Sequence, residues 1–296
     1  MGLKVEKVTK HFGEKLAVDN ITFEMSKPGV FGLLGTNGAG KTTTIRMMLG
    51  MLKKDSGEIT WNGKPVERKN VNFGYLPEER GIYPKTKIYE QLIYFAELKG
   101  LKKEEACKEI DYWMGRLKVE EYKNMLAEKL SKGNQQKVQF ITAILHNPEL
   151  IVLDEPFSGL DPVNSELLKG VILELVEKGK YIIMSSHQMS SIEEFCSDVV
   201  IINRGKTVLK GNLKEIKDSY PAKKLEISVK QDITNEIQEA GMQIEKNIDN
   251  NYEITIQNED QAHKLMKKLV EKGILINKFE LKKPSLNDIF IEKVGE

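Results

Sequence analysis

Residues 35–42 read Gly35-Thr36-Asn37-Gly38-Ala39-Gly40-Lys41-Thr42, which matches the phosphate-binding pattern G-x-x-x-x-G-K-[ST]. A compact apolar run before the loop, Val30 to Leu34, predicts a strand, and the periodicity from Lys41 to Leu52 predicts a helix after it. Glycines let backbone N–H groups turn inward around phosphate oxygens, and a helix N-terminus adds partial positive charge. Because strand and helix flank the loop, we reject a chance glycine turn and expect a nucleotide phosphate site.

The side chains of this loop have separate expected roles. Lys41 can reach the β- and γ-phosphate oxygens, and the Thr42 hydroxyl can ligate Mg²⁺. The other residues that we expect to bind the nucleotide here are Gly35, Thr36, Asn37, Gly38, Ala39, Gly40 and Thr43.

A second motif is the apolar run 151–153, which is followed by Asp154, Glu155 and a proline. An apolar strand that ends in two acids places carboxylates at the carboxyl edge of a parallel sheet, where ligands bind. Asp154 can hold Mg²⁺ directly or through water, and Glu155 can act as general base on an attacking water. Alone, the pattern is typical of an ordinary acidic turn. Beside a phosphate loop, it indicates a nucleoside triphosphatase.

Composition excludes several classes of protein. The chain has 296 residues, of which 40% are hydrophobic and 30% charged, so a wholly disordered chain is excluded. Lys and Arg number 45 against 44 Asp and Glu, which gives no electrostatic case for nucleic-acid binding. No apolar run approaches the roughly 18 residues of a membrane span, and the first residues lack a signal-peptide pattern. Cys107 and Cys196 form no metal or redox motif. We expect a soluble protein of a reducing compartment.

The order of apolar runs predicts an α/β core and a second, smaller domain. Strand patterns recur at residues 3–9, 21–25, 151–153, 181–184 and 199–202, with helices between the later ones, as in a parallel, doubly wound sheet. Helical periodicity dominates about 84–150. The remaining patterns follow the ferredoxin-like order β-α-β-β-α-β. The expected domains are residues 1–212 and 223–296, with 213–222 as a linker.

Residues 130–137 read Leu130-Ser131-Lys132-Gly133-Asn134-Gln135-Gln136-Lys137 and resemble the L-S-G-G-Q signature of the ATP-binding cassette (ABC) family. In that family the signature caps the γ-phosphate of an ATP held by a partner subunit. Ser131 lies at an expected helix start, where its hydroxyl, the Gly133 N–H and the helix dipole can meet an anion. The same residues also make a plain helix N-cap. Two residues depart from the family motif, at 132 and 134, whereas Gly133 is retained.

The resemblance covers residues 1 to about 220 and includes further motifs. The run 158–161, Ser-Gly-Leu-Asp, is similar to the D-loop, which implies that Asp161 lies near a dimer interface. His187 resembles the switch histidine that contacts the γ-phosphate. Phe12 matches the aromatic position that stacks on adenine, with a core phenylalanine as the alternative. The family's glutamine loop should follow residues 73–77, yet position 78 is Glu78, which can ligate Mg²⁺ or orient water while adding negative charge.

The resemblance implies a P-loop NTPase cassette with a mixed β-sheet core and a helical subdomain, followed by a small α+β ferredoxin-like domain. It implies ATP and Mg²⁺ as cofactors and Lys41, Glu155 and His187 as catalytic residues. It also implies a head-to-tail dimer of two copies. Each ATP site would then combine the P-loop and the acids Asp154 and Glu155 of one chain with Ser131 and Gly133 of the other.

Residues 76–84 and 284–290 are more specifically similar to ATPase subunits of sodium-extrusion-type exporters, which pair with a separate ABC-2 type permease. This similarity implies an ATPase at the cytoplasmic face of a bacterial membrane, driving export of sodium or a drug-like solute. The permease would dock around residues 78–87. One alternative is a soluble ATPase that acts on ribosomes or nucleic acid. The single cassette and the nearly equal numbers of positive and negative residues argue against this alternative. Another is a regulator that does not hydrolyse ATP, against which Glu155 counts.

Overall fold

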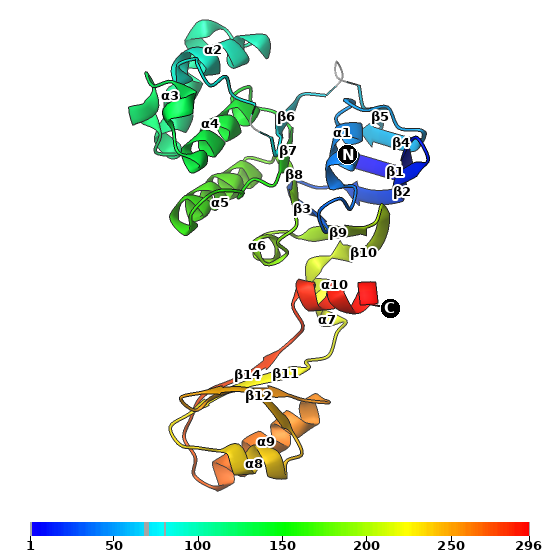
Figure 1. The fold of residues 1–296 in the computed structure, drawn as a ribbon, viewed down its shortest axis with the longest axis vertical. Coiled ribbons are helices and arrows are strands. Elements are labelled where there is room, and N and C mark those ends of the chain that lie inside the picture. The colour runs from blue at the N-terminus through cyan, green and yellow to red at the C-terminus, as the bar shows by residue number, and fades with distance from the viewer. Residues whose placement is uncertain (1, 68–70, 80, 296) are drawn as a thin grey trace. The chain divides into compact units, whose positions relative to one another are not determined.

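The computed structural model describes residues 2–67, 71–79 and 81–295 and divides the chain into two compact units, Met1–Lys210 and Gly211–Glu296 (Figure 1). Each unit has its own cluster of buried apolar side chains. Within the described ranges, no helix is both long and apolar enough to cross a membrane.

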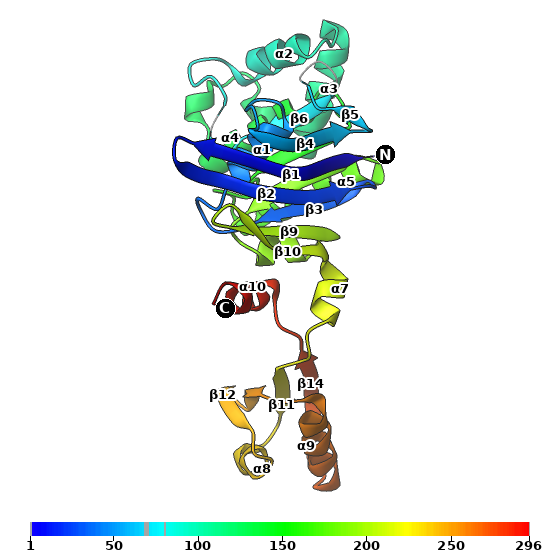
Figure 2. The same cartoon turned by 90° about the vertical axis from the view of Figure 1, so that its right-hand side faces the viewer.

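The first unit contains two sheets, and Figure 2 shows the strands of the antiparallel one facing the viewer. This antiparallel sheet has the order β2-β1-β4-β5, formed by β1 (Leu3–Phe12), β2 (Lys15–Met25), β4 (Ser56–Trp61) and β5 (Lys64–Pro65). The other sheet has the order β10-β9-β3-β8-β7-β6, formed by β3 (Gly29–Leu34), β6 (Phe73–Leu76), β7 (Leu150–Asp154), β8 (Tyr181–Ser186), β9 (Asp198–Asn203) and β10 (Lys206–Asn212).

Strands β9 to β6 of the second sheet run parallel to one another. Their interior positions read as continuous apolar runs because both faces of the sheet are covered, and residues of β1, β2 and β4 share one buried cluster with residues of β3, β7, β8 and β9. In β7, for example, every residue is buried. Two residues join β9 to β10, a connection that only antiparallel neighbours allow. The expectation of a mixed sheet in an α/β core is therefore confirmed.

Helices occupy the segments between these strands. The glycine loop leads from β3 into α1 (Lys41–Met48), which ends four residues earlier than the periodicity predicts. Between β6 and β7 lie α2 (Ile88–Leu98), α3 (Lys103–Arg116) and α4 (Lys132–Ile144), which Figure 1 shows grouped beside β6 and β7, with short 3₁₀ turns at Glu120–Tyr122 and Ala127–Lys129. The segments after β7 and β8 contain α5 (Pro162–Glu177) and α6 (Ser190–Glu193).

The second unit is built around a four-stranded antiparallel sheet of order β12-β13-β11-β14. Its elements are β11 (Lys224–Val229), α8 (Thr234–Glu239), β12 (Gln243–Ile248), β13 (Asn251–Thr255), α9 (Glu259–Glu271) and β14 (Ile276–Lys282). This is the β-α-β-β-α-β order expected from the sequence, and apolar residues of α8 and α9 pack against one face of the sheet. Two helices flank the sheet in the chain, α7 (Leu213–Asp218) and α10 (Leu286–Gly295).

Candidate nucleotide site

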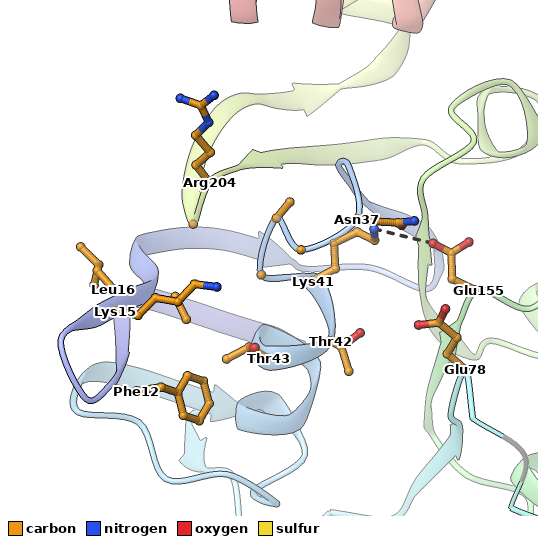
Figure 3. A pocket seen from close by; sticks show the side chains of 15 residues that line it. Phe12, Lys15, Leu16, Asn37, Lys41, Thr42, Thr43, Glu78, Glu155 and Arg204 are labelled. Carbon is orange, nitrogen blue, oxygen red and sulfur yellow. Dashed lines mark ion pairs between the residues drawn. The ribbon is translucent and has the colours of Figure 1, made fainter.

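A cavity of about 620 Å³ lies over the loop between β3 and α1 (Figure 3). Its volume falls within the range of sites for small molecules and cofactors. Residues 37–43 of the glycine loop and helix start line it, together with Phe12, Lys15, Leu16, Ala17, Glu78, Glu155, Arg204 and Gly205. The structure therefore brings residues from the N-terminal and the C-terminal parts of the first unit's sequence together around the expected phosphate loop.

At two positions of the loop, only glycine fits, because a side chain would collide with neighbouring backbone and because the backbone conformation is unfavourable for other residues. Gly35 has a φ of +151°, and a Cβ there would lie 2.1 Å from the Ile202 carbonyl oxygen. Gly40 has a φ of +108°, and its Cβ would lie 2.7 Å from the Ala17 carbonyl oxygen. Because L-residues rarely adopt such φ values, only glycine fits at these points of close packing against neighbouring strands.

Lys41 is buried and crosses the loop that precedes it. Its ammonium donates hydrogen bonds to the carbonyl oxygens of Gly35, at 2.9 Å, and Thr36, at 3.3 Å. The same nitrogen lies 3.6 Å from Glu155 Oε1, the ion pair drawn in Figure 3. The P-loop cation is thus held in the centre of the loop, where phosphate oxygens can compete for its donors.

Asp154 ends β7 and is almost completely buried. Its Oδ2 accepts a hydrogen bond of 3.0 Å from the Thr42 hydroxyl, and its Oδ1 accepts a short one from the Ser185 hydroxyl. Burial raises the pKa of the Asp154 carboxyl, and the hydrogen bonds from Ser185 and Thr42 oppose that rise.

The oxygen atoms of Thr42 and Asp154 form a donor set that suits Mg²⁺. This ion prefers oxygen ligands, keeps several waters and commonly binds through one or two protein groups plus substrate phosphates. Across the described ranges, no group of three His, Cys, Asp or Glu side chains could hold a metal by itself. The remaining ligands of an ion at Thr42 and Asp154 would be waters and nucleotide phosphates.

Glu155 follows β7 directly and has a strained backbone. Its φ of +51° lies in the left-handed region, which is uncommon for a residue other than glycine and is found at functional sites. Its N–H donates a hydrogen bond of 3.1 Å to the Ser185 hydroxyl, and its Oε1 lies 2.9 Å from His187 Nδ1. The structure therefore places the expected base between the expected P-loop lysine and the expected switch histidine.

Ser185 has no role in the sequence interpretation, although it lies two residues before the expected switch histidine, His187. The β7–β8 register pairs it with Asp154, so its hydroxyl reaches the carboxylate of one acid and the backbone of the next. The sequence shows only that a serine lies near the end of a buried strand. It does not show which strand is its neighbour or in what register the two strands pair.

A second cavity, of about 510 Å³, lies beside the first and is also lined by Glu155. Its other lining residues include His187 and the D-loop run 158–160. Asp161 follows this run as the N-cap of α5, accepting hydrogen bonds from the Asn164 backbone and side chain. These bonds lower the pKa of the Asp161 carboxyl.

Ser131 and Gly133 start α4 at a different place from the P-loop. The Ser131 hydroxyl accepts a hydrogen bond of 3.3 Å from the Asn134 N–H, as an N-cap does. A Cβ on Gly133 would lie 3.3 Å from Leu160 Cδ2, so the signature glycine packs against the D-loop. Of the described residues that line the 620 Å³ cavity, none is Ser131, Gly133 or Asp161.

Phe12 is 51% exposed at the end of β1, which is inconsistent with a core phenylalanine. Its ring lies at the cavity, away from Glu78 and Glu155 in the view of Figure 3. An exposed aromatic face beside a phosphate loop can stack on a nucleotide base. Glu78 is exposed and follows β6, so it lies at the expected glutamine-loop position in the cavity lining.

Comparisons with known proteins agree with this geometry. Residues 18–158 match the family described as ABC transporter, and residues 211–294 match the family described as ATP-binding protein DrrA1-3-like, C-terminal domain. The chain is 49% identical to the uncharacterized ABC transporter ATP-binding protein YhaQ of Bacillus subtilis, over 99% of this chain and 98% of that protein. It is 32% identical to the bacitracin transport ATP-binding protein BcrA of Bacillus licheniformis, over 99% and 97% of the two chains. A solved ATP binding subunit of an ABC transporter shares 29% identity with a TM-score of 0.68, over 74% of this chain and 93% of that one.

Proposed function

The chain belongs to the ATP-binding subunits of ABC transporters, a family that binds and hydrolyses ATP to power transport, and on that premise we propose that two copies of it drive a separate membrane permease. One observation carries the proposal. Lys41, Thr42 and the acids Asp154 and Glu155 meet at one place, whereas Ser131 and Gly133 present a capped helix start outside that cavity. Each chain thus offers two complementary half-sites, which a head-to-tail pair of copies would complete.

Within this site, each residue has a proposed contact. Phe12 stacks on adenine, while residues 35–43 hold the phosphates. Thr42, Asp154 and Glu78 would hold Mg²⁺, which when bound would neutralise charge on the phosphate oxygens. Ser131 and Gly133 of the second copy approach the γ-phosphate from the other side, next to the D-loop residue Asp161.

In the proposed mechanism, ATP hydrolysis requires Glu155 to exchange its contact with Lys41 for a contact with the attacking water. The Lys41 ammonium lies 3.6 Å from the Glu155 carboxylate. When Lys41 turns toward phosphate oxygens, the Glu155 carboxylate loses this partner and can accept a hydrogen bond from the attacking water as its general base. His187, 2.9 Å from Glu155, orients that carboxylate and contacts the γ-phosphate.

The permease is proposed to dock around residues 78–87, on an aromatic surface formed by Tyr83, Tyr94 and Phe95. Tyr83 and Tyr94 are each about half exposed, and Tyr83 stacks on Phe95 with ring centroids 5.8 Å apart. Exposed aromatic clusters are enriched in protein–protein interfaces. Docking there would hold the subunit at the cytoplasmic face of a bacterial membrane. Relatives named for bacitracin transport and linearmycin resistance support export of a drug-like solute, and sodium is the alternative cargo.

The decisive experiment uses Glu155→Gln, which keeps the shape of the side chain but cannot accept a proton. The rate of ATP hydrolysis should fall by roughly 10²- to 10⁴-fold, because general-base help is lost. ATP binding should be kept, so an ATP-bound dimer should accumulate and elute early in size-exclusion chromatography with ATP and Mg²⁺.

Two control variants separate the half-sites. In the Glu155→Gln background, a second substitution Lys41→Ala should abolish the dimer by removing phosphate binding. In the same background, Ser131→Ala should weaken the dimer, while a fluorescent ATP analogue still binds each monomer. A Glu155→Gln protein that hydrolyses ATP at the wild-type rate and stays monomeric would contradict the proposal.

A further inference from the structure

Gln139 lies in α4 and is 2% exposed, and it is not among the described residues that line the 620 Å³ cavity. Its Nε2 donates two hydrogen bonds to the loop after β6, to the Pro77 carbonyl oxygen at 3.1 Å and to the Glu79 carbonyl oxygen at 2.9 Å. These two carbonyls belong to the residues on either side of Glu78. A single buried amide from a distant part of the chain therefore holds both flanks of Glu78.

The chemistry of this contact favours a positioning role over simple packing. A buried amide costs free energy unless its donors and acceptor are paired, and Gln139 Oε1 has no hydrogen-bond partner among the described residues. An apolar side chain of similar size would fill the same space without that cost. Reversing the amide would place Oε1 against two carbonyl oxygens, so the orientation that binds the loop is the favourable one.

The same helix also contacts the segment after Glu155. One turn before Gln139, the buried Gln136 donates from Nε2 to the Pro156 carbonyl oxygen at 3.1 Å. Ser131 is the N-cap of α4, so one helix joins the signature half-site to residues that flank Glu78 and Glu155. A shift of α4 would therefore move the backbone of both acidic segments.

We propose that Gln139 is a positioning residue, which fixes the Glu78 carboxylate relative to Thr42 and Asp154 and makes its position depend on α4. The proposal rests on the proposed function, in which Glu78 acts at the magnesium–nucleotide site. Gln139 touches neither nucleotide nor metal, and acts through the two carbonyls that it binds.

The test is a double-mutant cycle of Gln139→Leu with Glu78→Ala in the full chain. Gln139→Leu should lower kcat by about 5- to 20-fold with the KM for ATP changed less than about twofold, because the P-loop is untouched. In the Glu78→Ala background the same substitution should have no further effect. Hydrogen–deuterium exchange of peptides that cover Glu78 and Glu79 should become faster in Gln139→Leu, which gives a readout independent of activity.

Gln91→Leu is the matched control. Gln91 is a glutamine of α2, 1% exposed, that accepts a hydrogen bond from the Tyr83 N–H and donates one to the Thr86 carbonyl oxygen. Its loss should lower the melting temperature to a similar extent without lowering kcat. If Gln139→Leu does not fold, Gln139→Met replaces it, because the flexible, unbranched side chain keeps the length but removes the donor.

Two results would overturn the proposal. One is an equal loss of kcat from Gln139→Leu with and without Glu78, and the other is unchanged exchange at Glu78 and Glu79. Failure of the proposed function is a separate outcome, because it would show as absent ATP hydrolysis in the wild-type chain, while the exchange experiment would still report on Gln139.

Discussion

The Ser185 hydroxyl binds two acids that have different tasks in the proposed mechanism. It donates to the Asp154 carboxylate and accepts from the Glu155 N–H, and it is completely buried. The positive φ of Glu155 is costly for a residue with a Cβ, so a hydrogen bond at that N–H helps to retain it. A small hydroxyl side chain thus supports both the proposed metal ligand and the backbone of the proposed base.

We predict that Ser185→Ala lowers kcat/KM by at least about tenfold, because a buried charge-assisted hydrogen bond contributes ~1.5–3 kcal/mol. The pH profile should change in a defined direction. Burial already raises the pKa of Asp154, and the Ser185 hydrogen bond lowers it. Removing that bond raises the pKa further, so the acid limb of kcat/KM should move to higher pH.

The control for this prediction is Ser186→Ala, which removes the buried hydroxyl that bonds to the Gln188 backbone. Its acid limb should stay at the wild-type pH. A Ser185→Ala enzyme whose profile superimposes on that of the wild type would show that the Ser185 hydroxyl does not act on Asp154.

The extent to which the site is predictable differs among its residues. Lys41, Thr42 and the acids 154 and 155 follow from motif and strand context, because loop-to-helix geometry and strand ends fix where such residues lie. Ser185 and Gln139 do not, because their roles depend on which strands and loops become neighbours across 31 and about 60 positions. Local periodicity carries no information about such long-range register.

At the level of elements, Glu174 connects α5 to α3. Its carboxylate accepts hydrogen bonds from the Tyr112 hydroxyl at 2.6 Å, from Arg116 at 2.8 and 3.0 Å, and from Lys178 at 2.9 Å. The Tyr112 hydroxyl, followed by Lys178 and Arg116, lowers the pKa of Glu174 to about 2. This cluster therefore stabilises the packing of the helical region against α5.

We predict that Glu174→Gln lowers the stability of the first unit by about 1 kcal/mol at pH 7, a value kept small because the side chain is 21% exposed. A carboxyl with a lowered folded pKa stabilises above its unfolded pKa of 4.5 and loses that contribution as pH falls toward about 2. The difference from wild type should therefore shrink below pH 4.5 and vanish below about pH 2.

Tryptophan fluorescence is the appropriate measurement of this difference. The chain has two tryptophans, Trp61 and Trp113, and both belong to the first unit, so the signal reports that unit alone. Tyr112→Phe should reproduce part of the loss. A Glu174→Gln protein whose midpoint in urea differs from wild type equally at pH 7 and pH 3 would contradict an ionic origin.

Buried or amphipathic elements are predictable, whereas exposed or very short ones are not. The buried runs of β3, β7, β8 and β9 and the amphipathic α9 have apolar patterns that identify them. Strands β4, β5, β6 and β10 are not evident from alternation, because they are short or largely exposed and are defined by their partners. Helix α7 lies within the expected linker, where its Asn212 cap and six-residue length give little periodic signal.

At the scale of the whole molecule, the two units have separate cores, so their stabilities are expected to respond to different substitutions. In the second unit, the buried Tyr252 hydroxyl donates to Asp232 at 2.7 Å and accepts from the Ile233 N–H at 3.2 Å. We predict that Tyr252→Phe destabilises this unit by ~1–3 kcal/mol, since it leaves the Ile233 N–H without that acceptor.

Calorimetry of the full chain, compared with tryptophan fluorescence, checks this prediction. One calorimetric transition should move to lower temperature, while the fluorescence transition and the ATPase rate stay unchanged. If fluorescence and calorimetry shift together, the two units unfold as one cooperative structure.

The position of β3 has a consequence for synthesis of the chain on the ribosome. The neighbours of β3 in the sheet are β8 and β9, and 147 positions separate Leu34 from Tyr181. At ~5–20 residues per second, translation takes about 7–30 s to deliver the first of these neighbours. During this interval the apolar strand that carries the phosphate loop has no partner on either edge and can associate with other nascent chains. The yield of folded protein therefore depends on the speed of translation, and on holdase chaperones, throughout the stretch between these two strands.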